Sequence, residues 1–119
     1  MLKAVLTAAC AGIALTAVAV PLTSGAVLAQ GMGLDGLHDK RREGGRVCMA
    51  DHFHDSSGNG ASRRQAEASA ARAWSEFTAW EYGGGWGSYS NAASKSMQCS
   101  DTGGGWSCQA TARPCRSGR

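Results

Sequence analysis

Residues 62–83 read SRRQAEASAARAWSEFTAWEYG and predict one long helix. Ser62 and Gln65 have the spacing of a capping box, in which two side chains satisfy free backbone N–H groups at a helix start. Gly83 adopts a left-handed conformation without steric penalty, so we expect the helix to end there. The apolar residues between these ends recur at helical spacing and form one stripe, made of Ala66, Ala70, Ala73, Trp74 and Phe77.

The residues before this helix predict a strand and then a loop. Residues 47–54, VCMADHFH, alternate between two faces, and Val47, Met49 and Phe53 share one of them. Residues 55–61 consist mainly of Asp, Ser, Gly and Asn, a composition that favours a loop.

The residues after the helix predict a β-hairpin. A turn about residues 103–104 pairs positions whose numbers add to 207, so Met97 faces Ala110 and Cys99 faces Cys108. This register brings the apolar residues of both strands to one side, which supports it. A bridge between the two facing cysteines is therefore expected.

The first 29 residues have the pattern of a secretory signal peptide. A positive start is followed by an uncharged run over residues 4–20, and Ala29 completes a small-residue cleavage site. A retained membrane anchor is the alternative, although a span needs roughly 20 strongly apolar residues. A second alternative is a lipoprotein with its lipid attached to Cys10. Thr7 argues against it, because a lipid-attachment site has a large aliphatic residue at that position. We predict a periplasmic or secreted protein.

Removal of residues 1–29 leaves four cysteines and, because Lys3 is lost, lowers the net charge from +3 to +2. An even number of cysteines in a short exported chain predicts two disulfides. The hairpin register favours Cys99–Cys108, which leaves Cys48–Cys115. The two other pairings and a zinc site of four thiolates remain alternatives. The weak positive charge does not favour a nucleic-acid partner, and the mature chain holds no membrane span.

The length of 119 residues allows one domain at most. Residues 30–46 mix glycines with charges and show no period, so we expect a flexible tail there. Residues 47–119 are predicted to form a small α+β domain of β-α-β-β order, with one long helix packed on an antiparallel sheet. A core of this size rarely supplies more than about 3–5 kcal/mol, so the disulfides are expected to brace it.

His52 and His54 form the motif with the clearest chemical content. On a strand, residues two apart point the same way and lie about 6.5 Å from each other, near enough to share zinc or copper. A site needs one or two further ligands, and only His38, Asp51 and Asp55 are at hand. The alternative is a pair of histidines that hydrogen-bond their neighbours on a solvent-facing or edge strand.

Two other surfaces are candidates for binding. Polar and cationic residues at the helix start could present backbone N–H groups and charge to a small anion, and they are Asn59, Ser62, Arg63 and Arg64. The ordinary alternative is a capped helix with solvated arginines. Trp80 and Trp86 flank a glycine run and could form a platform for a glycan, whereas Trp74 and Trp106 are expected in the core.

Several segments together resemble uncharacterised small exported proteins of proteobacteria. The resemblance covers residues 46–116 and rests on the order of VCMADHFH, AxxWxxF, EYGxxWxxYxxAxxKxxxC and WSC…ARPC. It implies secretion and carries no activity.

These observations predict an exported binding or envelope-interaction module that is not an enzyme. None of the nucleophile-elbow, P-loop, HExxH or SxxK patterns occurs in the sequence. The alternative function is a metal-binding protein or a metal-dependent hydrolase that uses His52 and His54.

Overall fold

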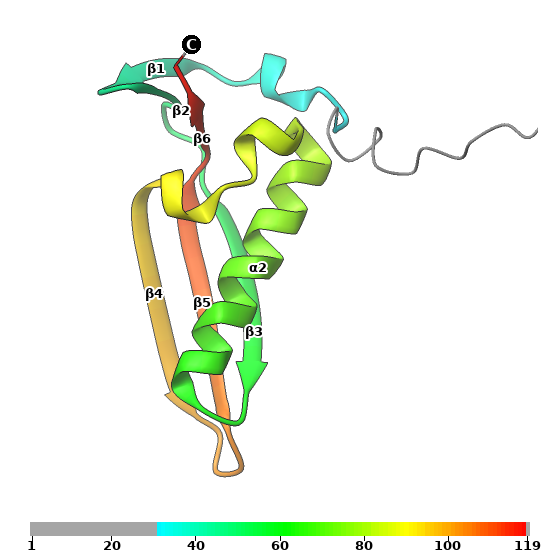
Figure 1. The fold of residues 1–119 in the computed structure, drawn as a ribbon, viewed down its shortest axis with the longest axis vertical. Coiled ribbons are helices and arrows are strands. Elements are labelled where there is room, and N and C mark those ends of the chain that lie inside the picture. The colour runs from blue at the N-terminus through cyan, green and yellow to red at the C-terminus, as the bar shows by residue number, and fades with distance from the viewer. Residues whose placement is uncertain (1–30, 119) are drawn as a thin grey trace, which may run out of the picture.

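A computed structural model describes residues 31–118, so the predicted leader over residues 1–29 lies outside the described residues. The domain is α+β, with one long helix and two small antiparallel sheets (Figure 1). Sheet A has the strand order β1-β2-β6, and sheet B has the order β3-β5-β4. The elements are η1 (Leu34–Leu37), β1 (Lys40–Glu43), β2 (Arg46–Met49), β3 (His54–Gly60), α2 (Arg63–Tyr82), η2 (Gly84–Trp86), η3 (Tyr89–Asn91), β4 (Ala93–Asp101), β5 (Trp106–Arg113) and β6 (Cys115–Ser117).

Helix α2 begins and ends where the sequence predicts. The Ser62 hydroxyl accepts from the Gln65 amide at 3.2 Å, and the Gln65 side chain accepts from the Ser62 amide at 3.2 Å, which completes the capping box. The helix ends at Gly83, whose φ of 103° is positive but whose ψ of 161° is extended rather than left-handed helical. Local signals alone are therefore enough to set both ends.

The buried stripe of α2 differs in its second half from the prediction. Buried residues recur at every fourth position, and they are Ala66, Ala70, Trp74, Thr78 and Tyr82. Because four residues turn the helix by about 40° more than a full turn, this stripe winds around the axis. Its start packs on sheet B, whereas Tyr82 packs beside Met49 and Trp86. Phe77, predicted in the core, is 42% exposed, and Ala73 is only half-buried.

Sheet B contains the predicted hairpin in the predicted register. Met97 is opposite Ala110, Cys99 is opposite Cys108, and these two cysteines form a disulfide. The apolar side chains of β4 and β5 face α2 and build the larger core. Figure 1 shows α2 lying across one face of this sheet and leaving the other face open.

The predictions for residues 50–61 are wrong. The expected strand stops at Met49, the chain bends, and residues predicted as a loop form β3 from His54 to Gly60. Its glycines allow α2 to approach closely, since a Cβ on Gly58 would lie 2.2 Å from the Ala70 nitrogen. The composition that suggested a loop instead reflects tight packing between helix and strand.

The predicted flexible tail is also wrong. Within residues 34–46 the chain forms η1 and β1, and β1 pairs with β2 in sheet A. Strand β6 pairs with the other side of β2, where Cys48 and Cys115 lie opposite each other and form the second predicted disulfide. Strand β1 shows no apolar period because it is a charged edge strand of the sequence KRRE.

Arg113 joins the two sheets. It is the last residue of β5, only 6% exposed, and its guanidinium donates to the Met49 carbonyl at 2.6 Å. The same group lies 2.8 Å from a carboxylate oxygen of Glu43 on β1. A hydrogen bond from Arg41, with Arg113 adding to it, lowers the pKa of Glu43. The buried cation thus has an anionic partner at the junction.

Candidate functional site

The open face of sheet B carries an ordered array of polar side chains. Cys108, Ala110 and Ala112 of β5 point toward α2, so the residues between them point to the open face. The same alternation holds in β3 and β4, whose partners are fixed by the register. The array comprises Asp55, Ser57 and Asn59 of β3, Ser107, Gln109 and Thr111 of β5, and Ser96, Gln98 and Ser100 of β4.

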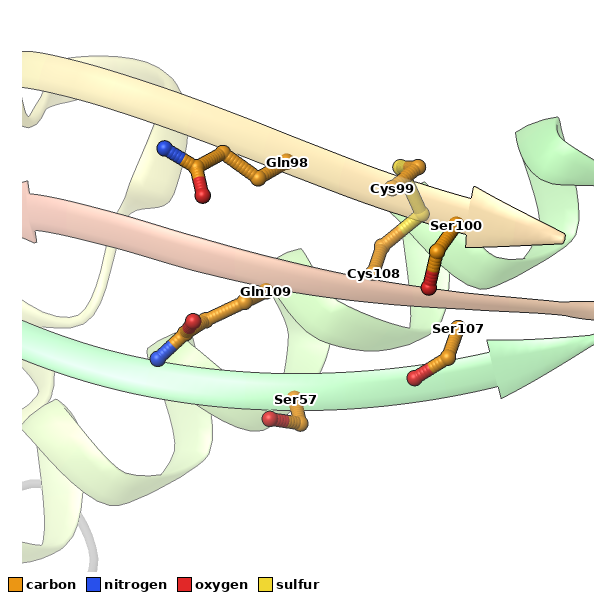
Figure 2. Close-up of a pocket in the computed structure, with 7 residues that line it drawn as sticks. All are labelled: Ser57, Gln98, Cys99, Ser100, Ser107, Cys108 and Gln109. Atoms are coloured by element: carbon orange, nitrogen blue, oxygen red, sulfur yellow. A yellow bond between two sulfur atoms is a disulfide. The ribbon is translucent and has the colours of Figure 1, made fainter. Parts of the chain in front are cut away.

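These nine residues form three rows across the strands. The rows are Asp55–Thr111–Ser96, Ser57–Gln109–Gln98 and Asn59–Ser107–Ser100. Neighbouring strands lie about 4.8 Å apart, and alternate residues of one strand about 6.6 Å apart, so the side chains repeat in two directions. The middle row, with Ser107 and Ser100 of the third row and the Cys99–Cys108 disulfide, lines a shallow depression of about 350 Å³. Figure 2 shows these side chains.

The chemistry of this array is nearly neutral. Asp55 is its one charged member, and the Thr111 hydroxyl donates to the Asp55 carboxylate. The remaining side chains are amides and hydroxyls, which both donate and accept hydrogen bonds. An open antiparallel sheet face is normally polar, but the absence of Lys, Arg and Glu from all nine positions is specific to this face. It suits a neutral ligand that is rich in hydroxyl groups.

The sequence does not reveal this array as long as residues 55–61 are interpreted as a loop. The alternation of polar side chains with Gly58 and Gly60 was the available signal. Both glycines lie on the helix-facing side, where a Cβ would meet the backbone of α2. With that side assigned to the core, Ser57 and Asn59 fall on the open face.

The predicted histidine pair belongs to a different environment. His54 is 3% exposed, and its Nδ1 lies 2.8 Å from the Thr78 hydroxyl. Its Nε2 lies 3.1 Å from the Tyr82 hydroxyl and 3.0 Å from a Glu81 carboxylate oxygen. Because a carboxylate only accepts, we assign the proton to Nε2, so that Nδ1 accepts from Thr78. Both ring nitrogens are thereby occupied.

Burial governs the ionisation of this cluster. It lowers the pKa of His54 to about 4, and the charges of His52 and His38 add to the effect, whereas Asp55 opposes it. The Glu81 carboxylate, 3.0 Å from Nε2, acts in the same direction as Asp55. Burial likewise lowers the pKa of His52 and raises that of Tyr82. His54 is therefore neutral at pH 7.

The metal site predicted from His52 and His54 does not form. His52 lies in the bend before β3, and its ring meets that of His54 edge-on at 5.1 Å. His38 stacks on His52 at 4.0 Å, so these two rings face each other instead of converging on one point. Within residues 31–118 no group of three His, Cys, Asp or Glu side chains could hold a metal ion. The zinc or copper interpretation is corrected accordingly.

The residues predicted for an anion do not converge. Ser62 caps the helix, and Arg63 turns toward Glu67, with Nε 3.0 Å from the carboxylate. Arg64 is exposed on α2, and Asn59 belongs to the polar array of sheet B. An anion site at this helix start stays a prediction.

The tryptophan platform is wrong for one of its two members. Trp80 is 51% exposed, but Trp86 is 4% exposed and packs with Met49 and Tyr82. Trp74, predicted in the core, is fully buried, and its indole N–H donates to the His54 carbonyl at 3.0 Å.

No protein-family model, curated protein or solved structure matches this chain. Between Gly31 and Gly118 no helix has the length and apolar character needed to cross a membrane. The two disulfides suggest an oxidising, extracytoplasmic environment.

Proposed function

We propose that this protein is an exported module that binds neutral glycans through the open face of sheet B. The observation that carries the proposal is the array of nine polar side chains in register, of which Asp55 alone is charged. Carbohydrate hydroxyls pair with amides and hydroxyls, and they need no counter-charge. The proposed location is periplasmic or secreted, supported by the leader pattern in residues 1–29 and by the disulfides.

The geometry favours a polymer over a single sugar. The array repeats along and across the strands, so a chain of sugar units can make the same contacts several times. Each neutral hydrogen bond contributes only about 0.5–1.5 kcal/mol, because water competes for the same groups. No aromatic ring lies in the array to add stacking energy. Useful affinity therefore requires several adjacent contacts.

Gln98 and Gln109 are the residues to test, since they lie opposite each other in the middle row. We expect the double variant Gln98→Ala/Gln109→Ala to lose about tenfold in affinity for a neutral polysaccharide, because two or more hydrogen bonds are removed. The measurement is retention in affinity electrophoresis through gels that contain each of a panel of neutral polysaccharides.

A matched control removes two polar side chains from the exposed surface of α2. Arg72→Ala/Glu76→Ala leaves the net charge and the array unchanged, so retention is expected to equal that of the wild type. Thermal unfolding followed by circular dichroism checks that both variants keep the fold. The proposal fails if no polysaccharide retards the wild type, or if both double variants lose retention equally.

A further inference from the structure

Sheet A concentrates the positive charge of the molecule. Its three strands hold five of the chain's twelve Lys and Arg residues and one of its nine Asp and Glu residues. Of the other eight carboxylates, Asp35, Asp39 and Asp51 flank β1 and β2 in the sequence, and five lie in β3, α2 and β4. The cations of sheet A are Lys40, Arg41, Arg42, Arg46 and Arg116, and the carboxylate is Glu43.

Three of these cations share one face of the sheet. Arg42 is opposite Val47, and Val47 is opposite Arg116, so the two arginines flank Val47 on the same side. Lys40 lies two residues from Arg42 and therefore points to this face as well. The Lys40 ammonium and the Arg116 guanidinium lie 5.9 and 5.3 Å from the centre of the Trp86 ring, which packs with Val47 and Met49 of the same face.

The two arginines of this row are available for an external anion. Both are exposed, and neither lies within ion-pair distance of a carboxylate among residues 31–118. Arg42 donates to the Gly118 carbonyl at 3.2 Å, a contact that orients the guanidinium without neutralising it. Lys40, in contrast, pairs with Asp35 at 3.3 Å. The strand spacing puts Arg42 and Arg116 about 10 Å apart at the backbone, which suits several headgroups on a surface.

Two exposed apolar residues lie at the same end of the domain as these cations. Leu37, just before β1, is 78% exposed, and Met32 is 56% exposed. In Figure 1, η1 and sheet A lie at the same end of the molecule, where the described chain begins. In the sequence, the uncharged run over residues 4–20 precedes this end of the described chain.

We propose that the face of sheet A that carries Lys40, Arg42 and Arg116 binds the anionic headgroups of a phospholipid bilayer. Cations together with exposed apolar side chains are the combination by which peripheral proteins associate with such surfaces. This surface is separate from the polar array of sheet B, so either function can fail without the other.

The test is co-sedimentation of the purified, oxidised protein with vesicles. We expect binding to vesicles of phosphatidylcholine mixed with phosphatidylglycerol, weaker binding at higher salt, and none to phosphatidylcholine alone. Arg42→Ala/Arg116→Ala is expected to lower the partition coefficient about 30-fold, the effect of two cations near an anionic surface. Arg64→Ala/Arg72→Ala removes the same charge from exposed positions of α2 and is expected to change it by less than about threefold.

Three outcomes would overturn the proposal. Equal losses in the two double variants mean that net charge, not this face, drives binding. Equal binding to phosphatidylcholine alone means that anionic headgroups are not recognised. Absence of vesicle binding, or its removal by inorganic phosphate at a concentration where matched chloride has no effect, assigns the arginines to a free anion or to no ligand. Circular dichroism and melting temperature show whether each variant is folded.

Discussion

The two sheets have the same number of strands and the same covalent plan, but the strands of sheet A are shorter and the two sheets are stabilised differently. Each has three antiparallel strands and one disulfide between directly opposite residues. Sheet B has a twenty-residue helix on one face and an alanine-rich core between them. Sheet A has no such cover, and its apolar contacts are two small clusters around Cys48 and Met49. Buried area holds sheet B together, whereas sheet A depends on a covalent bond and on the Arg113–Glu43 ion pair.

This difference extends to the open surfaces. The array of sheet B is nearly neutral and regular, whereas sheet A collects cations. A well-packed layer can leave its other face free for ordered hydroxyl and amide groups. A thin sheet without a large core can carry exposed charge, because charged side chains at an edge also discourage pairing with other chains.

The largest change in the free energy of unfolding is expected when one disulfide is removed at a time. The Cys48–Cys115 bridge closes a separation of 67 residues and the Cys99–Cys108 bridge one of 9. In the chain-entropy model these bridges contribute about 4 and about 3 kcal/mol. We expect Cys48→Ser/Cys115→Ser to lower the free energy of unfolding more than Cys99→Ser/Cys108→Ser does, as measured by urea denaturation.

Amide hydrogen exchange shows which strands are destabilised when a disulfide is removed. Amides of β1 and β2 are expected to lose protection in Cys48→Ser/Cys115→Ser while those of β5 keep it. A larger loss of stability in Cys99→Ser/Cys108→Ser, or unchanged protection of β1 without the long bridge, would show that sheet A does not depend on its disulfide.

A change of pH tests how much the buried, neutral His54 at the start of β3 contributes to stability. The unfolded ring has a pKa of about 6.5, whereas burial holds the folded pKa at about 4. The unfolded state therefore binds the proton more readily, so stability is complete above pH 6.5 and falls as the pH drops toward 4. The total loss is on the order of 3 kcal/mol, of which about 2 kcal/mol falls between pH 7 and pH 5.

The control for this prediction is His54→Gln, which keeps an amide that can bond Thr78 and Tyr82 but has no titrating ring. Its free energy of unfolding is expected to change less than that of the wild type between pH 7 and pH 5. NMR titration of the His54 ring gives the pKa directly. An imidazole that titrates near 6.5 in the folded protein would contradict the argument.

The elements predicted correctly are those whose signals are local. Three of them depend on residues close in sequence: the capping box of Ser62 and Gln65, the helix end at Gly83, and the pairing of β4 with β5. The register also predicted both disulfides, because the second pair followed once the first was assigned. In these regions the side-chain pattern and the position of the turn indicate the same structure. A prediction is reliable when such independent signals agree.

The elements that were missed have two different causes. Strand β3 becomes regular only between α2 and β5, and its paired strand β5 is far along the chain. Strand β1 pairs with the neighbouring β2 across Gly44 and Gly45, and it was missed because its charged residues show no apolar period. The histidine motif failed for the same reason as β3. The groups that occupy the ring of His54 are Thr78 and Tyr82, 24 and 28 residues away on α2, and nothing near His54 in the sequence indicates them.

The smallest effect is expected from one methyl group between α2 and sheet B. On Gly58 a Cβ would lie 2.2 Å from the Ala70 nitrogen and 2.5 Å from the Ser69 carbonyl carbon, so backbone must move. Gly58→Ala is therefore expected to lower the free energy of unfolding by about 2 kcal/mol, the range for an overpacked core. Gly104→Ala is the matched control, since no atom lies within 4 Å of its Cβ and its φ is not positive. Urea denaturation compares the two variants. If Gly58→Ala is as stable as Gly104→Ala, the helix does not need close contact with β3, and packing no longer distinguishes sheet B from sheet A.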